Sequence, residues 1–352
     1  MHHSSPQNVA LVAGATGIVG SKLVETLLAQ QWQVIGLTRQ QTPATQPIPL
    51  VNVDLLDSSR SAAVLAGLTD VTHIFYSAWL DAPDWSTMVE PNLAMLRNLV
   101  QGIDAVAPLR HVSLMQGYKV YGAHLGRFKT PARESDPEVA GAEFNAAQLA
   151  WLSAYQRGKS WSWSALRPGV VGSQVAGNMM NLALSIALYA SLCRALALPL
   201  RFPASPATWN SMVDHTDGTL LAAATVWAAE NDAARNQAFN VNNGDLWRWS
   251  ELWPAIARWF ELDCAPAAAL SFQQLFRDYR PQWQTLAEQA GLRQTDLLQL
   301  NDGRFADFVF SWDYDMFGDG SKIRRAGFSH YRATDQMFFD LFSQFRQAKI
   351  IP

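Results

Sequence analysis

The chain has 352 residues, of which 49% are hydrophobic and only 16% are charged. This is enough for one large domain, or a domain with a smaller lobe, around a sizeable core. A net charge of −3 without a long basic run argues against a nucleic-acid partner. The two cysteines, Cys193 and Cys264, lie far apart, so the sequence has neither a disulfide framework nor a zinc motif and fits a reducing cytoplasm.

Short apolar runs alternate with segments of helical spacing along the first half of the chain. The apolar runs, each typical of a buried parallel strand, cover residues 8–14, 33–39, 50–57, 71–79 and 110–116. The segments with helical spacing between them cover residues 21–32, 61–68 and 90–106. Strict alternation of this kind predicts an α/β fold with a Rossmann-type, doubly wound parallel sheet.

The second half of the chain, beyond about residue 170, is predicted to be mainly helical. Its longest apolar stretch, residues 179–193, is too short to cross a bilayer and predicts a buried helix. No signal peptide precedes the first strand, so we expect a cytoplasmic protein without a membrane partner. We expect a dinucleotide-binding domain mainly within residues 1–172. The smaller, mainly helical substrate lobe is expected within 173–352, with some segments returning to the sheet.

Two features of the second half invite a functional interpretation that the sequence does not favour. Trp247, Trp249, Trp253 and Trp259 follow one another at near-helical spacing, which predicts core packing more than a ligand box. His215 is a candidate base, but a histidine at a strand end that is bonded to the backbone is more common.

The segment GATGIVG, residues 14–20, is a glycine-rich loop that follows a strand and opens a helix. Gly14 permits the tight turn, Gly17 lets the backbone approach a pyrophosphate, and Gly20 allows the helix to pack on the strand. The phosphate group would lie at the positive end of the helix. This context predicts dinucleotide binding; the alternative is a tight turn without a ligand.

The end of the second predicted strand distinguishes NADP from NAD. NAD-binding proteins usually place an acid there for the ribose 2′-hydroxyl, whereas this chain has Thr38 and Arg39. A guanidinium is always charged and bonds a phosphate in a bidentate way. The sequence therefore predicts NADP(H), the alternative being a solvated surface arginine.

Several short stretches together resemble the progesterone 5β-reductase/iridoid synthase-like family of extended, atypical short-chain dehydrogenases/reductases. They cover residues 14–20, 70–79, 126–137, 161–172, 178–190, 238–249, 322–328 and 349–352. The resemblance extends over nearly the whole chain and is weakest around residues 265–310. It implies an NADPH-dependent reductase that adds hydride to the β-carbon of an enone, with a Tyr and a Lys facing the carbonyl and the nicotinamide ribose.

The same resemblance and the strand ends together predict the cofactor contacts. They are expected at Gly14, Thr16, Gly17, Ile18, Val19, Gly20, Thr38, Arg39, Asp54, Leu55, Ser77, Ala78, Trp79, Gln116, Lys119, Pro168, Gly169, Val170 and Val171.

The catalytic pair that the resemblance implies is only half present. The family's Gly-x-Lys-x-Tyr stretch falls on residues 117–121, so Lys119 matches the family lysine. Its ammonium is expected to bond the ribose hydroxyls and to place positive charge where an enolate forms. The family's catalytic tyrosine instead falls on Asn145, beside a matching Phe144, and the following Glu-Asp pair is replaced by Leu149 and Ala150.

Several interpretations of the missing tyrosine remain open. Asn145 can donate an amide hydrogen bond to a substrate oxygen but cannot supply a proton. Tyr121 or Tyr118, on either side of Lys119, could replace the phenol. The chain could also have kept the cofactor site and lost or changed its chemistry, or residues 144–147 could simply be the first turn of an amphipathic helix.

The preferred prediction is an NADPH-dependent reductase of a small apolar conjugated carbonyl compound, an enone or a quinone-like acceptor, with Lys119, Asn145 and Tyr121 as catalytic candidates. An enolate is less basic than the alkoxide formed by direct carbonyl reduction, so it suits a site without a tyrosine acid. The alternatives are a non-catalytic NADPH-binding sensor or regulatory protein, and a biosynthetic enzyme using NADPH for other redox chemistry. A homodimer is left open, and no metal is expected.

Overall fold

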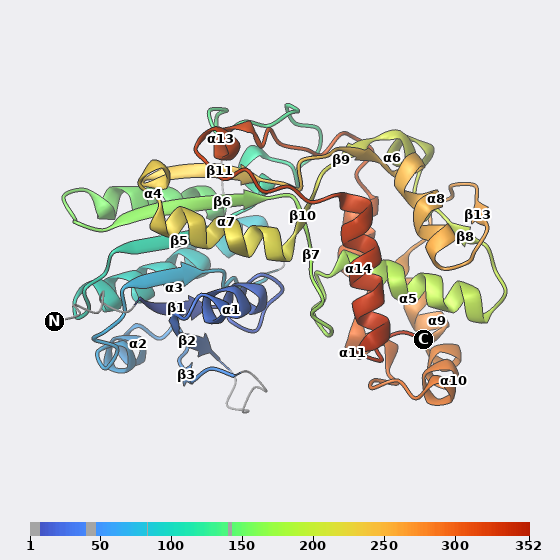
Figure 1. The fold of residues 1–352 in the computed structure, drawn as a ribbon, viewed down its shortest axis with the longest axis horizontal. Helices are drawn as coiled ribbons and strands as arrows, with labels where there is room; N and C mark the ends of the chain where they lie inside the picture. The colour runs from blue at the N-terminus through green and yellow to red at the C-terminus, as the bar shows by residue number, and fades with distance from the viewer. Residues whose placement is uncertain (1–7, 40–46, 83, 140–142) are drawn as a thin grey trace.

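The computed structural model describes residues 8–39, 47–82, 84–139 and 143–352. A seven-stranded, wholly parallel sheet in the order β11-β6-β5-β4-β1-β2-β3 forms one half of the molecule (Figure 1). Its strands are β1 (Val9–Ala13), β2 (Gln33–Thr38), β3 (Leu50–Asn52), β4 (His73–Tyr76), β5 (His111–Met115), β6 (Ser162–Pro168) and β11 (Gln237–Val241). The strand order reverses between β1 and β4, as in a doubly wound sheet, and confirms the predicted fold class.

Helices cover both faces of this sheet (Figure 1). On one face, α1 (Gly20–Ala29) and α7 (Gly218–Glu230) pack over β1 and β4 in a shared apolar cluster. On the other face lie α2 (Ser58–Leu65), α3 (Trp85–Asp104) and α4 (Phe144–Gln156). Burial on both sides explains why the strands are continuous apolar runs without alternation.

Several predicted elements have different limits in the structure, and two of the differences have a clear local description. The strand predicted over 50–57 ends at Asn52, because Asp54 closes a turn by accepting from the Leu56 amide and Asp57 caps α2 by accepting from the Arg60 amide. The helix predicted from residue 90 already begins at Trp85 and contains Pro91. Pro91 therefore lies beyond the first turn of the helix.

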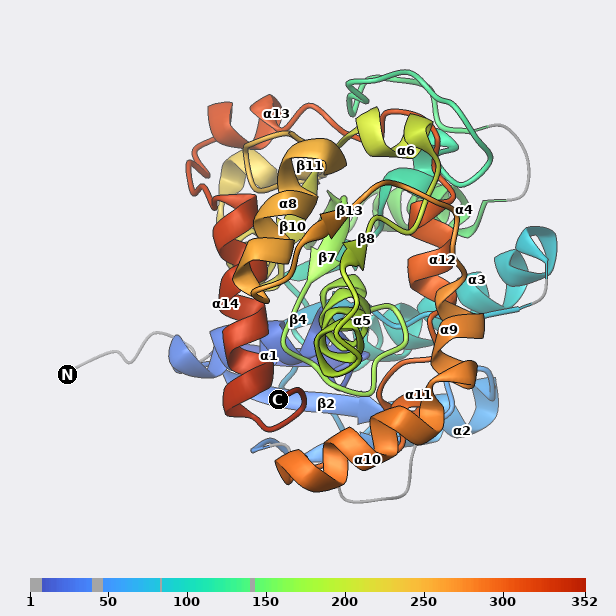
Figure 2. The same ribbon diagram turned by 90° about the vertical axis from the view of Figure 1, so that its right-hand side faces the viewer.

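The C-terminal half is a helical lobe around α5 (Leu182–Ala195), which Figure 2 shows end-on among its neighbours. Residues 182–193 of α5 are all buried, as expected of the apolar stretch 179–193. The surrounding helices are α6 (Pro206–Asn210), α8 (Trp249–Trp259), α9 (Phe272–Asp278), α10 (Arg280–Ala290), α11 (Leu297–Leu300), α12 (Arg304–Phe310) and α14 (Thr334–Gln347). Trp249 and Trp253 are fully buried against Phe202 and Phe310, so this part of the tryptophan cluster is core.

Segments of the second half also return to the first. Strand β11 joins the edge of the large sheet, α7 covers one of its faces, and the short helix α13 (Ser321–Arg325) packs near β11. Three two-stranded pairs complete the fold: β7 (Val170–Gly172) with β10 (His215–Asp217), β9 (Met212–Val213) with β12 (Trp247–Arg248), and β8 (Leu200–Arg201) with β13 (Cys264–Ala265). A division of the chain near residue 172 stays a prediction.

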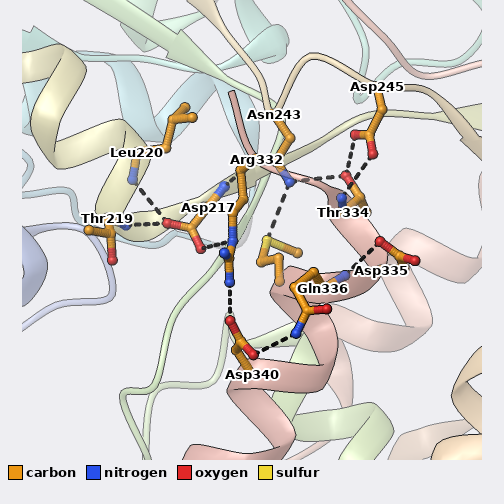
Figure 3. A network of polar contacts seen from close by, with 11 residues as sticks. Asp217, Thr219, Leu220, Asn243, Asp245, Arg332, Thr334, Asp335, Gln336 and Asp340 are labelled. Atoms are coloured by element: carbon orange, nitrogen blue, oxygen red, sulfur yellow. Dashed lines mark hydrogen bonds and ion pairs between the residues drawn. The ribbon is translucent and has the colours of Figure 1, made fainter. Parts of the chain in front are cut away.

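A polar network anchors the start of α14 to the end of β10 (Figure 3). Asp217 caps α7 by accepting from the Thr219 and Leu220 amides at 2.8 and 2.9 Å. Arg332 lies between Asp217 and Asp340 and forms ion pairs with both. Because these residues join the sheet half to the helical lobe, the network helps to hold the two halves in their relative position.

No helix within the described ranges is long and apolar enough to cross a membrane.

Candidate functional site

The glycine-rich loop between β1 and α1 leaves no room for side chains at its turns. Gly14 has a φ of +82°, and a Cβ placed there would lie 2.9 Å from the carbonyl carbon of Ser77. A Cβ on Gly20 would lie 2.1 Å from the Gly14 carbonyl oxygen. The loop therefore lies directly against the end of β4, and α1 begins at Gly20 with its positive end toward the loop.

A first cavity, of about 290 Å³, opens beside this loop at the carboxyl ends of β1, β2 and β4. Apolar residues form most of its outer wall, and Arg39, exposed at the end of β2, lines its rim. Exposed glycine backbone, a helix N-terminus and a guanidinium are the groups that a dinucleotide phosphate requires, so the residues present fit NADP(H). The predicted residues that line it are Gly14, Thr16, Gly17, Thr38, Arg39, Leu55, Ser77, Ala78 and Trp79.

Asp54 differs from this prediction. Its side chain is exposed and its carboxylate accepts from the Leu56 amide at 3.1 Å, while its neighbours Val53 and Leu55 line the cavity. The apolar residues on each side of Asp54 therefore line the first cavity. The Asp54 carboxylate itself stabilises the turn after β3.

A second cavity, of about 280 Å³, lies next to the first, because Gly17, Ser77, Ala78 and Trp79 line both. It lies between the carboxyl ends of β4, β5 and β6 and the helical lobe. The predicted residues along it are Gly17, Ile18, Val19, Gly20, Ser77, Ala78, Trp79, Gln116, Lys119, Asn145, Pro168, Gly169, Val170 and Val171. The two cavities thus lie side by side, with Arg39 lining the first and Lys119 lining the second.

Lys119 lies in the single turn, Tyr118–Tyr121, that follows β5. Its ammonium sits 4.3 Å from the ring centroid of Trp85 and 5.3 Å from that of Trp79. Burial lowers the pKa of Lys119 below its usual range, although the carboxylates of Glu143 and Asp81 act in the opposite direction. Among the described residues no carboxylate lies within 4 Å of this ammonium, so its charge remains available to a ligand.

Asn145 is buried in the first turn of α4 and lines the same cavity as Lys119. Its side-chain amide donates to Glu143 Oε1 at 2.7 Å, and Glu143 also caps α4 by accepting from the Ala146 amide at 2.8 Å. The backbone carbonyl of Asn145 accepts a hydrogen bond from Gln116 Nε2 at 2.7 Å. One N–H of the amide is therefore committed to Glu143, and the second remains for another acceptor.

The two tyrosines beside Lys119 are engaged elsewhere. The hydroxyl of Tyr121 donates to Asn240 Oδ1 at 2.7 Å and accepts from Arg167 at 3.0 Å, and Tyr121 is not among the residues lining the cavity in the described part of the chain. Tyr118 lines the cavity, but its hydroxyl donates to the buried carboxylate of Asp214 at 2.7 Å. Burial raises the pKa of Tyr121 to about 12. The geometry thus turns the candidate acid Tyr121 away from the proposed substrate space.

A buried arginine orients several of these groups. Arg167 on β6 donates to Gln116 Oε1 at 2.9 Å and to the Tyr121 hydroxyl at 3.0 Å, and it pairs with Glu138 at 2.7 Å. Gln116, predicted as a cofactor contact, therefore also connects Arg167 to the backbone of Asn145. This chain of hydrogen bonds holds the end of β5 and the start of α4 in one arrangement.

His215 lies outside both cavities, as far as the described residues that line them show. Its ring packs edge-on against Trp249 and Phe338, with centroids 5.6 and 5.1 Å apart. Burial lowers its pKa to about 4, so it is neutral at physiological pH and packs as part of the core.

The helical lobe contributes a wall of the second cavity that no sequence motif indicated. This wall is aromatic and sulfur-rich, and Phe308 and Trp312 meet edge-on with centroids 5.2 Å apart. Its residues are Asn178, Met180, Phe305, Phe308, Trp312 and Met316. The spacing of Phe305, Phe308 and Trp312 is that of one helical face, but it falls where the family resemblance is weakest. His124, which lines the cavity near Lys119, was not singled out either.

The arrangement combines an apolar space with few charges. Lys119 is the only Lys, Arg, Asp or Glu among the described residues that line the second cavity. A cation in an apolar, partly dehydrated site stabilises a developing oxyanion far more than it would in water. The space between Lys119 and the aromatic wall therefore suits a planar apolar molecule that acquires negative charge on oxygen.

Comparison with curated proteins places two plant enzymes beside this chain over nearly its full length. The chain is 32% identical over 367 residues to an (S)-8-oxocitronellyl enol synthase of Nepeta racemosa, covering 98% of this chain and 94% of that protein. It is 30% identical over 367 residues to the 3-oxo-Δ4,5-steroid 5β-reductase of Arabidopsis thaliana, again covering 98% and 94%.

Solved structures share the fold at low sequence identity. A short-chain dehydrogenase/reductase superfamily protein from Agrobacterium tumefaciens superposes with a TM-score of 0.67 at 15% identity, covering 97% of this chain and 98% of that one. UDP-glucose 4-epimerase from Thermus thermophilus superposes with a TM-score of 0.59 at 20% identity, covering 85% and 98%. At this identity the likeness concerns the fold alone. Residues 10–352 match the PRISE-like Rossmann-fold domain, and the chain belongs to that family.

Proposed function

We propose that the protein is an NADPH-dependent oxidoreductase that reduces an apolar, conjugated carbonyl compound, an enone or a quinone-like acceptor. The observation that carries this proposal is the pair of adjacent cavities. The first lies beside the glycine-rich loop and Arg39, and the second, which we call the chamber, is lined by Lys119 and by aromatic side chains. The two plant relatives support the reaction class, since their names describe an enol synthase and a reductase of a 3-oxo-Δ4,5 steroid.

In this proposal each group of residues has a stated role in the reduction of an enone. Bound NADPH would supply a hydride, which in an enone goes to the β-carbon of the conjugated double bond. The Gly14–Gly20 loop and Arg39 bind the phosphate groups, and Lys119 binds ribose hydroxyls and faces the forming enolate with its positive charge. The second side-chain N–H of Asn145 donates a hydrogen bond to the enolate oxygen. Solvent then protonates the α-carbon of the enolate.

The chamber selects for apolar and flat substrates. Trp79 and Phe144 stack with centroids 6.4 Å apart and an interplanar angle of 14°, and Phe305, Phe308 and Trp312 form the opposing wall from the helical lobe. Ring faces and edges of this kind bind conjugated molecules through stacking and burial of apolar surface.

The proposal is tested by measuring the loss of NADPH absorbance with a panel of enones, quinones, aldehydes and simple ketones. We expect turnover of enones or quinones and little activity on simple ketones, because an alkoxide is far more basic than an enolate. Turnover of simple ketones at comparable rates would contradict the altered site. A cytoplasmic location and a homodimer stay predictions, to be tested separately.

Replacing Arg39 by alanine should remove most of a preference for NADPH over NADH. A guanidinium that loses its phosphate contact costs about 1–3 kcal/mol, so we expect the Kd for NADPH to rise and that for NADH to change little. Fluorescence titration of both cofactors measures this. Arg60→Ala, at an exposed position on α2, is the matched control. Equal affinities for the two cofactors in the unmodified protein would rule the assignment out.

Replacing Asn145 by tyrosine should introduce a phenol facing the chamber that Lys119 lines. If Asn145 occupies the position of the family's tyrosine, kcat/KM for enones rises in Asn145→Tyr and gains a pH dependence from the new phenol. Asn145→Phe is the control, since it has the same ring without the hydroxyl. A gain of equal size in both variants would show that ring volume, and not the phenol, is responsible.

The replaced tyrosine also favours a second candidate, a non-catalytic NADPH-binding sensor. A protein of this kind would bind NADPH and turn over no acceptor in the panel, and NADPH would change its association with another protein. Size-exclusion chromatography of the protein with and without NADPH, combined with the acceptor panel, separates the two candidates.

A further inference from the structure

His124 is an unexplained polar side chain in the wall of the chamber. Its ring lines the cavity together with Lys119 and Asn145. Nδ1 is shielded from solvent and lacks a hydrogen-bond partner among the described residues. A buried nitrogen left in this state costs roughly 1–3 kcal/mol, and because it is shielded it does not itself face the cavity. Nε2 is not shielded and also has no hydrogen-bond partner among the described residues, so it is the nitrogen that a ligand in the cavity can reach.

The backbone holds His124 in a rigid turn directly after the lysine segment. Gly122 has a φ of +84°, and its carbonyl accepts from the Leu125 amide at 2.9 Å. The Ala123 carbonyl accepts from the hydroxyl of Tyr314 at 2.8 Å, which ties the turn to the helical lobe. These two hydrogen bonds fix the backbone around His124, so its imidazole can bind a ligand without a rearrangement of the turn.

The surroundings keep the imidazole neutral. Its ring packs edge-on against Trp85 with centroids 4.5 Å apart, and the Lys119 ammonium lies 4.3 Å from the same tryptophan ring. Burial, and then the positive charge of Lys119, lower the pKa of His124 to about 4. At neutral pH the ring is therefore an uncharged donor with one N–H.

From this geometry we infer that the His124 imidazole donates a hydrogen bond to the carbonyl oxygen of the substrate and, with Lys119, stabilises the enolate. This inference rests on the proposed function. In this chain Asn145 occupies the position of the family's tyrosine, and we assign to His124 the hydrogen bond that this tyrosine would donate. The competing explanation is that His124 serves only to pack against Trp85.

The test uses a probe that does not depend on turnover. The protein with saturating NADP⁺ is titrated with 4-nitrophenolate, which carries an oxyanion on a flat ring, and with nitrobenzene, which has the same ring without it. The variants are His124→Phe, which keeps a ring and removes both nitrogens, and His124→Asn and His124→Gln. The asparagine amide reaches near Nδ1, and that of glutamine near Nε2. His330→Phe, an exposed position stacked on Phe328 outside the chamber, is the matched control.

We expect His124→Phe to lower the affinity for 4-nitrophenolate roughly 10- to 100-fold, as for a lost oxyanion donor, and to leave the affinity for nitrobenzene nearly unchanged. Recovery of phenolate affinity by Asn or Gln supports the inference and identifies the acting nitrogen. The Lys119 charge is common to all variants. Phenolate affinity unchanged in His124→Phe, or equal losses for both probes, would overturn the inference.

Enone reduction by the same variants separates this inference from the proposed function. If the unmodified protein reduces no acceptor but shows the phenolate pattern, the reductase proposal fails and the donor site stands. If the protein reduces enones and His124→Phe changes neither kcat/KM nor phenolate binding, the inference fails and the reductase proposal stands.

Discussion

Replacing Lys119 by methionine is expected to lower kcat/KM for enone reduction roughly 1000-fold while the protein remains folded. Methionine keeps an unbranched apolar stem against Trp79 and Trp85 and removes the ammonium. Within the described part of the chain, no other Lys or Arg lines the second cavity, so no nearby cation replaces the lost charge. The size of the effect follows from removing a preorganised charge in a partly dehydrated site.

The pH dependence provides an independent measurement of the same role. Burial lowers the pKa of Lys119 below its usual 10.5, so the required cation is lost as the pH rises through this lowered pKa, at a lower pH than for an exposed lysine. We expect kcat/KM to fall on the alkaline side in the unmodified protein and to show no such limb in Lys119→Met. Tyr121, with its pKa raised to about 12, titrates above this limb.

Two controls show that a loss of activity in Lys119→Met comes from the missing ammonium and not from a damaged fold. Circular dichroism and thermal unfolding should match those of the unmodified protein, and Lys119→Arg should recover part of the activity because it restores a cation of different shape. Turnover unchanged in Lys119→Met would exclude the active-site role of Lys119.

Replacing Arg167 by methionine is expected to lower the free energy of unfolding by about 1–3 kcal/mol, as for a buried acceptor left without its donor. The Arg167 side chain is 2% exposed and holds Gln116, Tyr121 and Glu138 at once. Its loss leaves the Gln116 carbonyl without its donor inside the protein. Through Gln116, the start of α4 and the position of Asn145 should also become less well defined.

Urea unfolding of the two proteins measures this loss. Arg235→Met is the matched control, because Arg235 is about half exposed and its pair with Asp232 spans 3.8 Å at the surface; we expect it to change stability by less than about 1 kcal/mol. An equally small change in Arg167→Met would show that the buried network does not contribute to stability as proposed.

Local patterns in the sequence were enough to predict the first five strands of the sheet, the helices α1, α2 and α3 between them and the cofactor loop, but not the strands β6 and β11 that complete the sheet. Each strand buried on both faces is a continuous apolar run, and each covering helix has one apolar face, so the alternation of the two is visible without any long-range contact. The loop at residues 14–20 is similarly local, because its glycines are required by contacts within one strand–turn–helix unit. Lys119 follows a strand end and matched a short motif, and so it could be identified in the same way.

Only the tertiary structure decided what faces the substrate space. Tyr121 is two residues from Lys119, yet its hydroxyl meets Asn240 and Arg167, which come from other strands. Sequence spacing gives no direction for a side chain in a single turn. Phe308, on α12, and Trp312, just after that helix, reach the cavity from more than 180 residues beyond Lys119, and the neutrality of His124 arises from burial and from the lysine charge. These properties depend on contacts between distant segments, which local periodicity does not encode.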